Sequence, residues 1–194
     1  MDRLAAALAA IDAANGDDPH VIMVDGVARP KELAHAELMT HWVRTLDPAC
    51  SEQQILAARA HHLRRWTIPR ASYPDGRSGY LKWRTALKRQ HADDVGAILR
   101  EAGYDHDSVA RVQAIVAKRG LGHDRAVQVH EDALCLVFLE TQLDELAGRM
   151  GDDKTVDILQ KTAKKMSPAG LEAARGLRFS PSAAELLDRA LASL

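Results

Sequence analysis

Apolar residues recur along most of this chain at intervals of three and four positions, the spacing that gathers side chains on one face of an α-helix. In the segment 31–46, for example, Leu38, Met39, Trp42 and Leu46 share one face. Turn and capping residues interrupt the pattern repeatedly, which divides the chain into eight or nine helices. We predict helices over approximately 2–16, 31–46, 51–65, 78–103, 107–118, 125–148 and 153–165, with two short helices after Ser167 and Ser180.

Several of these boundaries carry specific capping signals. Ser51 and Gln54 have the spacing of a capping box, in which each residue satisfies a free backbone N–H of the other. Ser167 and Ser180 each precede a proline, which suits the first helical position. Residues 17–30 differ, because a β-like run, VIMV, precedes an Asp-Gly pair. No partner strand is evident in the sequence, so we predict an ordered loop there.

The composition supports a folded domain. The chain of 194 residues is long enough for one sizeable core, and its 46% hydrophobic and 27% charged residues argue against disorder. The net charge of −1 gives no general attraction to nucleic acid or to a membrane surface. We therefore predict an all-α, single-domain helical bundle over residues 1–194.

Location follows from the cysteines and the apolar runs. Cys50 and Cys135 are isolated, which excludes a disulfide framework and favours a reducing, cytoplasmic compartment. The apolar run near the amino terminus is short and interrupted by Asp12, so it predicts an amphipathic helix rather than a signal peptide. No run approaches the length of a membrane span, and we expect no membrane contact. The sequence leaves the oligomeric state open.

The segment from Ala60 to Arg84 combines aromatic and cationic residues more densely than any other part of the chain. Its prolines, Pro69 and Pro74, forbid a continuous helix. We interpret it as a shaped loop that faces an anion. The alternative is a structural loop whose arginines cap helix ends and stack on tryptophans. The candidate substrate-binding residues are Arg65, Trp66, Arg70, Tyr73, Arg77, Tyr80, Trp83 and Arg84.

Four ionisable residues fall on apolar helical stripes and are predicted to point inward: His35, His62, His91 and Asp132. A buried carboxylate needs a cation or strong hydrogen-bond donors. Three imidazoles and one carboxylate suit a divalent transition metal, namely Mn, Fe, Ni, Co or Zn. The alternative is that each histidine forms its own hydrogen bond in the core and that Asp132 pairs with Arg84 or Arg59.

The same helical periodicity predicts which neighbouring polar residues are buried and which are exposed. Glu131 is partly inward and is the candidate general base or water-orienting group. His61 falls on the wetter side of its helix, and His130 is interpreted as solvated or capping. The lysines near Met166, which are Lys161, Lys164 and Lys165, predict a solvated surface.

The order of these residues resembles the HD-domain metal phosphohydrolases, over about residues 31–145. HAELMTHW with His35, LAARAHHL with His62, KRQHADDVGAILREAGY with His91 and VQVHEDALCLVFLE with Asp132 are similar to the histidine and aspartate helices of those enzymes. The resemblance implies an all-helical, HD-like fold with one or two metals. The sequence departs from the defining His-Asp doublet, because Leu63 follows His62.

A second resemblance covers almost the whole chain. HHLRRWTIPRASYPDGRSGYLKWR, EDALCLVFLE and DILQKTAKKMS resemble an uncharacterised family of about this length from bacteria and fungi. Some of its members carry a glutamyl-tRNA synthetase label. This chain is too short for such an enzyme and has no nucleotide-binding signature of a synthetase.

The leading functional hypothesis is a metal-dependent phosphohydrolase that acts on a small phosphorylated metabolite or nucleotide. Its metal ligands are His35, His62, His91 and Asp132, and arginines of the 64–84 loop bind phosphate. The alternative is a non-catalytic helical module that binds a nucleotide or RNA through the same loop. A third hypothesis is an iron oxidase or oxygenase, since histidines and a carboxylate also bind iron.

Overall fold

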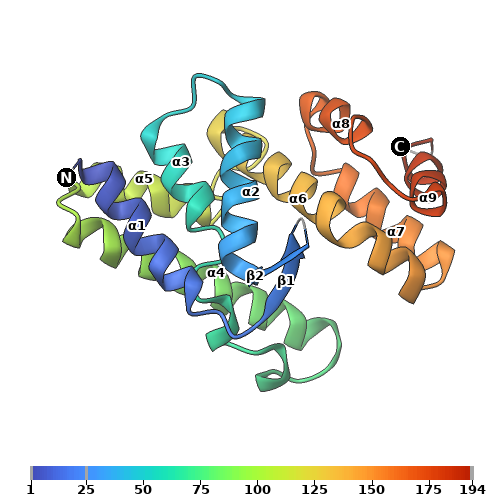
Figure 1. Cartoon of the computed structure of the whole chain (residues 1–194), viewed down its shortest axis with the longest axis horizontal. Coiled ribbons are helices and arrows are strands. Elements are labelled where there is room, and N and C mark those ends of the chain that lie inside the picture. Colours follow the sequence, from blue (N-terminus) through green and yellow to red (C-terminus); the bar gives the residue numbers. More distant parts are fainter. Residues whose placement is uncertain (1, 25, 193–194) are drawn as a thin grey trace.

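The structure is a computed structural model that describes residues 2–24 and 26–192. Within them, nine α-helices, two short 3-10 turns and one hairpin make up the regular structure (Figure 1). The predominantly helical class is confirmed, and the 3-10 turns bring the helical segments above the predicted eight or nine. The helices are α1 (Arg3–Gly16), α2 (Lys31–Leu46), α3 (Glu52–Arg59), α4 (Gly76–Glu101), α5 (His106–Val116), α6 (Arg125–Arg149), α7 (Asp152–Ala163), α8 (Pro168–Arg175) and α9 (Pro181–Leu191).

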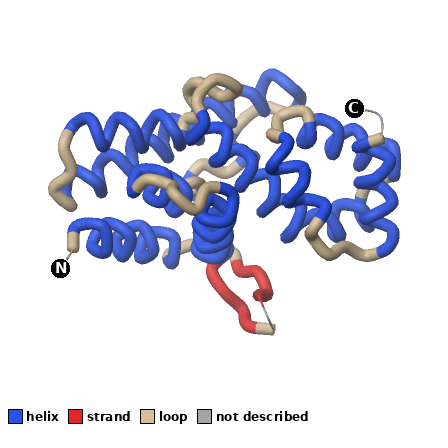
Figure 2. The backbone as a smooth tube through the Cα atoms, turned by 90° about the horizontal axis from the view of Figure 1, so that it is seen from above, coloured by secondary structure: helices blue, strands red, loops and turns tan. Residues whose placement is uncertain are grey.

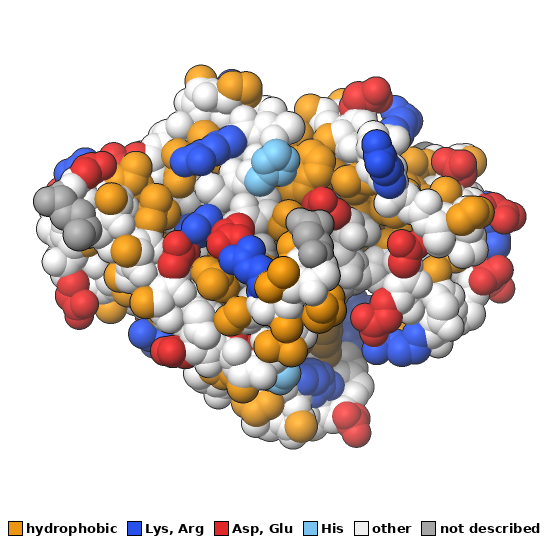
Figure 3. Space-filling model, viewed as in Figure 1, with side chains coloured by type: hydrophobic (Ala, Val, Ile, Leu, Met, Phe, Trp, Pro, Cys, Tyr) orange, Lys and Arg blue, Asp and Glu red, His pale blue; other side chains and the backbone are white. Residues whose placement is uncertain are grey.

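The predicted loop at 17–30 is wrong in one respect, because it contains an antiparallel hairpin. Strand β1 (Val21–Val24) pairs with β2 (Val27–Pro30), with Val24 opposite Val27. Gly26, in the turn, has a φ of 77°, which glycine adopts without strain. The partner strand escaped prediction because it is short and includes arginine and proline. The hairpin projects from the helices (Figure 2), with apolar side chains at its surface (Figure 3).

Capping residues determine most helix starts as predicted. The Ser51–Gln54 capping box forms, and the side chains of Asp124, Ser167 and Ser180 accept backbone hydrogen bonds at the starts of α6, α8 and α9.

Two other predicted N-caps are displaced, one by three residues and the other by two. Helix α4 begins after Asp75 rather than at Ser78. Helix α5 is capped by Asp105 rather than Asp107. In each case, an earlier aspartate occupies the N-cap position.

The third predicted helix is too long. Helix α3 ends at Arg59 rather than near 65, and the chain continues through turns to the 3-10 segments Arg65–Thr67 and Arg70–Ser72. Arg64, in this stretch, has a left-handed backbone with φ 52°. A left-handed residue cannot continue a right-handed helix, so helical periodicity does not apply to the side chains that follow α3.

The hydrophobic core separates the molecule into two lobes. In the first, α1, α3, α4 and α5 bury residues such as Ile11, Leu56 and Leu99. In the second, the last part of α6 packs with α7, α8 and α9 around residues such as Leu143 and Leu159. Helix α6 contributes to both lobes, and α2 packs along its middle. Each buried leucine contributes about 1.5–3 kcal/mol. Among the described residues, no helix has the length and apolar character needed to cross a membrane.

A cationic cavity and an adjoining Glu-His-His cluster

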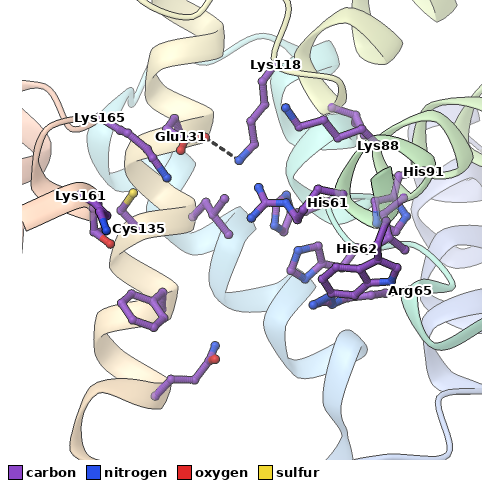
Figure 4. Close-up of a pocket in the computed structure, with 18 of the residues that line it drawn as sticks. His61, His62, Arg65, Lys88, His91, Lys118, Glu131, Cys135, Lys161 and Lys165 are labelled. Carbon is purple, nitrogen blue, oxygen red and sulfur yellow. Dashed lines mark ion pairs between the residues drawn. The ribbon is translucent and has the colours of Figure 1, made fainter. Parts of the chain in front are cut away.

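A cavity of about 400 Å³ lies between the two lobes, within the range of about 300–1,000 Å³ that is usual for small-molecule sites. One wall consists of α4 and the segment that follows α3. The opposite wall consists of α6, α7 and the turn after α7 (Figure 4). The residue Lys118, just after α5, reaches the cavity between these walls.

The cavity has a strongly positive lining. It holds six cationic side chains and a single carboxylate, Glu131, which pairs with Lys118 at 2.5 Å. No ion pair within residues 2–24 and 26–192 involves the cations Arg84, Lys88 or Lys165. Walls of low dielectric constant strengthen the potential that such a set of charges produces. The cavity therefore favours an anionic ligand. The six cations are Arg65, Arg84, Lys88, Lys118, Lys161 and Lys165.

Three histidines also line this cavity, and burial makes them neutral at pH 7. Burial lowers the pKa of His91 to about 3 and lowers the pKa of His61 well below its usual range. Burial also lowers the pKa of His62, although the neighbouring Glu32 acts in the opposite direction. The positive charge of the cavity therefore comes from lysine and arginine. A neutral imidazole retains a nitrogen lone pair that can bind a metal.

His62 also belongs to a cluster of three side chains of types that bind metals, together with Glu32 and His35. The ligand atoms of these three side chains are all within 4.8 Å of one another. The Oε2 atom of Glu32 is 3.1 Å from Nδ1 of His62 and 3.7 Å from Nδ1 of His35. Arg65 joins this cluster to the cavity, since its Nε lies 3.8 Å from the other oxygen of Glu32. His62 is the member that also lines the cavity.

Local structure fixes each member of this cluster. Glu32 and His35 are one turn apart on α2, so their side chains share a face. The carboxylate of Asp18 accepts the backbone N–H of Glu32 and fixes the first turn of that helix. Beyond α3, Leu63 anchors the backbone, because its carbonyl accepts a hydrogen bond from Nδ1 of His91 at 2.8 Å.

The chemistry of the cluster fits a divalent metal. Burial raises the pKa of Glu32, but His62 and His35 lower it by more, and the net effect keeps this pKa well below its usual range. An ionised carboxylate and two imidazoles are ligands that Zn, Fe, Mn, Co and Ni share. Three protein ligands leave positions open for water or a substrate.

The four predicted metal ligands do not form a single site. His35 and His62 come together, but His91 lies outside the cluster, with its ring centroid 5.8 Å from that of His62. Asp132 accepts hydrogen bonds from the backbone N–H of Ser167 at 2.8 Å and from its Oγ at 2.6 Å. The expectation that these four side chains come together is therefore wrong, and Glu32, rather than Asp132, is the carboxylate beside His35 and His62.

The alternative partners of Asp132 are also corrected. Arg59 pairs with Asp12, and Arg84 donates to the hydroxyl of Tyr80. Asp132 thus connects α6 with the start of α8. Glu131, one residue earlier and about 100° around the helix, faces the cavity instead.

The predicted exposures of two histidines are wrong as well. His61 and His130 are 6% and 1% exposed, and Nδ1 of His61 lies 3.2 Å from Nε2 of His130. Nε2 of His61 and Nδ1 of His130 have no hydrogen-bond partner among the described residues. The prediction failed for His61 because α3 ends before it, and for His130 because α6 is buried on several faces.

The predicted 64–84 loop is only partly a loop, because its residues from Gly76 onward belong to α4. It makes structural contacts and also contributes lining residues to the cavity. Arg70 donates to the carbonyls of Tyr73 and Pro74, which is a structural role. Arg65 stacks on Trp83, with the guanidinium carbon 4.9 Å from the ring centroid. Of the eight candidate residues, four line the cavity and four, which are Trp66, Arg70, Tyr73 and Arg77, do not; those that do are Arg65, Tyr80, Trp83 and Arg84.

Sequence reasoning missed several residues of the cavity and the cluster. Lys161 and Lys165 line the cavity rather than only a solvated surface, while Lys164 does not. Their separation of four residues places both on one face. Glu32 was identifiable because a glutamate and a histidine three residues apart share a helix face. The other missed residues are His61, Lys88 and Lys118.

The backbone at two positions beside the cavity is unusual. Lys118 and Arg64, which precedes Arg65, have left-handed φ angles of 56° and 52°. Non-glycine residues adopt this conformation rarely, and such strain often occurs at functional sites. The side chain of Lys118 is 8% exposed, and burial lowers the pKa of that lysine.

These features define a class of helical protein with a small hairpin and a cationic cavity between two lobes. Residues 5–187 match the family described as a domain of unknown function, DUF4202. The chain belongs to this family, which confirms the expectation of an uncharacterised family. Comparisons with curated proteins and with solved structures give no match.

Proposed function

We propose that this protein is a metal-dependent hydrolase that acts on a small phosphorylated molecule or nucleotide. The observation that supports it is the position of His62, which belongs both to the cationic cavity and to the Glu32–His35–His62 cluster. An anion bound by the cavity would thus lie beside the residues best suited to hold a metal. The order of His35 and His62 along the chain also resembles that of the HD-domain phosphohydrolases.

Different residues of the cavity would have different roles in such a reaction. Arg65 and Arg84 would bind the phosphate through guanidinium groups, whose planar shape suits two-point contacts with phosphate oxygens. Glu131 is the carboxylate of the cavity and would accept a proton from the attacking water. A metal held by the cluster would supply Lewis-acid chemistry and lower the pKa of a bound water.

Elemental analysis of the purified, untagged protein by inductively coupled plasma mass spectrometry tests this proposal first. We expect about one equivalent of Mn, Fe, Ni, Co or Zn in the wild type, and loss of that metal in His62→Ala and Glu32→Gln. His41→Ala is the matched control, because His41 lies on α2 but is exposed. A screen of phosphorylated metabolites with the bound metal would then measure turnover.

Two results would contradict the proposal. One is a protein that takes up no metal after soaking and buffer exchange. The other is a metal content that stays the same in His62→Ala and Glu32→Gln.

A second candidate function is binding of the same class of ligand without turnover. It is favoured by the pairing of Glu131 with Lys118, which leaves the cavity without an unpaired carboxylate among its lining residues. This function predicts that phosphorylated ligands or RNA bind and that no metal produces turnover. The metabolite screen therefore separates the two functions.

A further inference from the structure

Four of the six cations of the cavity form two separate groups. Arg65 and Arg84 come from the segment after α3 and from α4, whereas Lys161 and Lys165 come from α7 and the turn that follows it. Helix α4 packs on α5 and α1, and α7 packs on α9 and α6. Figure 4 shows the two lysines on the opposite side of the cavity from Arg65, with Lys118 between them. The two groups therefore face each other across the cavity.

Both walls of the cavity also offer uncharged contacts. Helix α6 contributes Leu134, Cys135 and Phe138 to the lining, and α4 contributes Leu87. Burial raises the pKa of Cys135 to about 12, so this thiol is neutral and adds no charge. A ligand that extends from one group of cations to the other would place an uncharged middle portion among these side chains.

One phosphate does not account for both groups. A phosphate oxygen accepts a charge-assisted hydrogen bond only when the donor is within about 3 Å, so cations on opposite sides of a cavity of about 400 Å³ are matched better by two anionic groups than by one small anion. Lys161 is free to serve a ligand, because its ion pair with Asp157 is 68% exposed on the lysine side and is therefore weak.

We propose that the ligand of this cavity carries two anionic groups separated by an uncharged spacer. One group, a phosphate, binds Arg65 and Arg84 beside His62. The second group, a phosphate or a carboxylate, binds Lys161 and Lys165. The identity of the first group as the one that is cleaved rests on the proposed function, but the two-ended binding does not.

The test is isothermal titration calorimetry in a buffer that contains a chelator, so that binding is measured without metal-dependent turnover. The probes are butyl phosphate and two series with spacers from ethylene to octamethylene, the α,ω-alkanediol bisphosphates and the ω-carboxyalkyl phosphates. We expect the best bisphosphate or carboxyalkyl phosphate to bind at least about tenfold more tightly than butyl phosphate, the gain typical of one further charged hydrogen-bonded group. The better of the two series identifies the second anion.

The double variant Lys161→Gln/Lys165→Gln should remove this preference, so that the two-ended probes and butyl phosphate bind with similar affinity. Lys164→Gln is the matched control and should retain the preference, because Lys164 is on the same helix end but does not line the cavity. All three lysines are exposed, so none of the changes removes buried contacts. Circular dichroism would verify the fold of each variant.

Three outcomes would overturn the inference: equal affinity for one-ended and two-ended probes, a preference that survives in the double variant, or no binding of any probe. Binding with the expected preference, but no turnover with any metal, would instead refute the hydrolase and leave the two-ended ligand standing. Metal-dependent turnover of simple monophosphates, with no preference for two-ended probes, would refute the two-ended ligand and support the hydrolase.

Discussion

Replacing His130 by glutamine should make the protein less sensitive to mild acid. His130 is 1% exposed, and burial lowers its pKa to about 3, with the charge of Lys118 acting in the same direction. In the unfolded chain, the same imidazole has its ordinary pKa of 6.5. Between these two values the unfolded state binds a proton that the folded state does not bind. Stability therefore falls as the pH decreases from about 6.5 toward about 3.

The size of the effect follows from the separation of the two pKa values. At about pH 5, protonation of this one histidine favours the unfolded state by about 2 kcal/mol relative to about pH 7. Glutamine does not titrate in this range, and its terminal amide can replace Nε2 of His130 as the partner of His61. His130→Gln should therefore lose about 2 kcal/mol less stability than the wild type between these pH values.

Urea unfolding monitored by circular dichroism at about pH 7 and about pH 5 measures this difference. With a urea dependence of roughly 2 kcal/mol per molar, the midpoint of the variant should fall by about 1 M less than that of the wild type. His106→Gln is the control, because the side chain of His106 is 95% exposed. This control should behave as the wild type does at both pH values.

An equal loss of stability in wild type and His130→Gln would refute the reasoning, since it would mean that His130 is protonated in the folded protein or is already solvated. A difference that also appears in His106→Gln would show that the effect belongs to loss of any histidine rather than to burial.

Three further changes test the buried contacts of α6. Asp132→Ala should lower the free energy of unfolding by about 3 kcal/mol, because its hydrogen bonds with Ser167 are lost. Its metal content should stay unchanged. Loss of the metal in this variant would show that Asp132 is a metal ligand after all. Gly170→Ala should cost about 1–3 kcal/mol in urea unfolding, because a Cβ there would lie 2.7 Å from Cγ of Asp132, and a neutral result would refute this close packing. Lys118→Met should cost about 3–5 kcal/mol, since Glu131 would remain buried and unpaired; adding Glu131→Gln should restore most of that loss, and no recovery would exclude the ion pair as its cause.

Interactions between residues within one helical turn could be predicted from the sequence. The N-caps Ser51, Asp124, Ser167 and Ser180 depend only on a side chain and the backbone N–H groups two or three residues later. For the same reason, the helical class and most helix boundaries could be predicted. The hairpin was harder, because its second strand is stable only as a partner of the first.

The site was harder to predict because it depends on helix phase and on contacts between lobes. Helical phase marked both Glu131 and Asp132 as inward, and both are buried, since α6 packs against elements on several sides. Periodicity alone cannot assign one to a cavity and the other to the start of α8. At His61 the phase itself was wrong, because the helix that would have set it ends at Arg59, whereas His62 reaches the predicted inward position beside Glu32 and His35.

The distribution of charge in this cavity favours an anionic ligand. Two lobes that share α6 bring lysines and arginines together from both sides, and Glu131 is the single carboxylate among the lining residues. Like charges in such a place repel one another, while the strained backbone at Lys118 adds to the cost of the arrangement. A bound anion that contacts both walls would remove this repulsion and link the lobes. The features that weaken the ligand-free fold are therefore the ones that would make a two-ended anion bind.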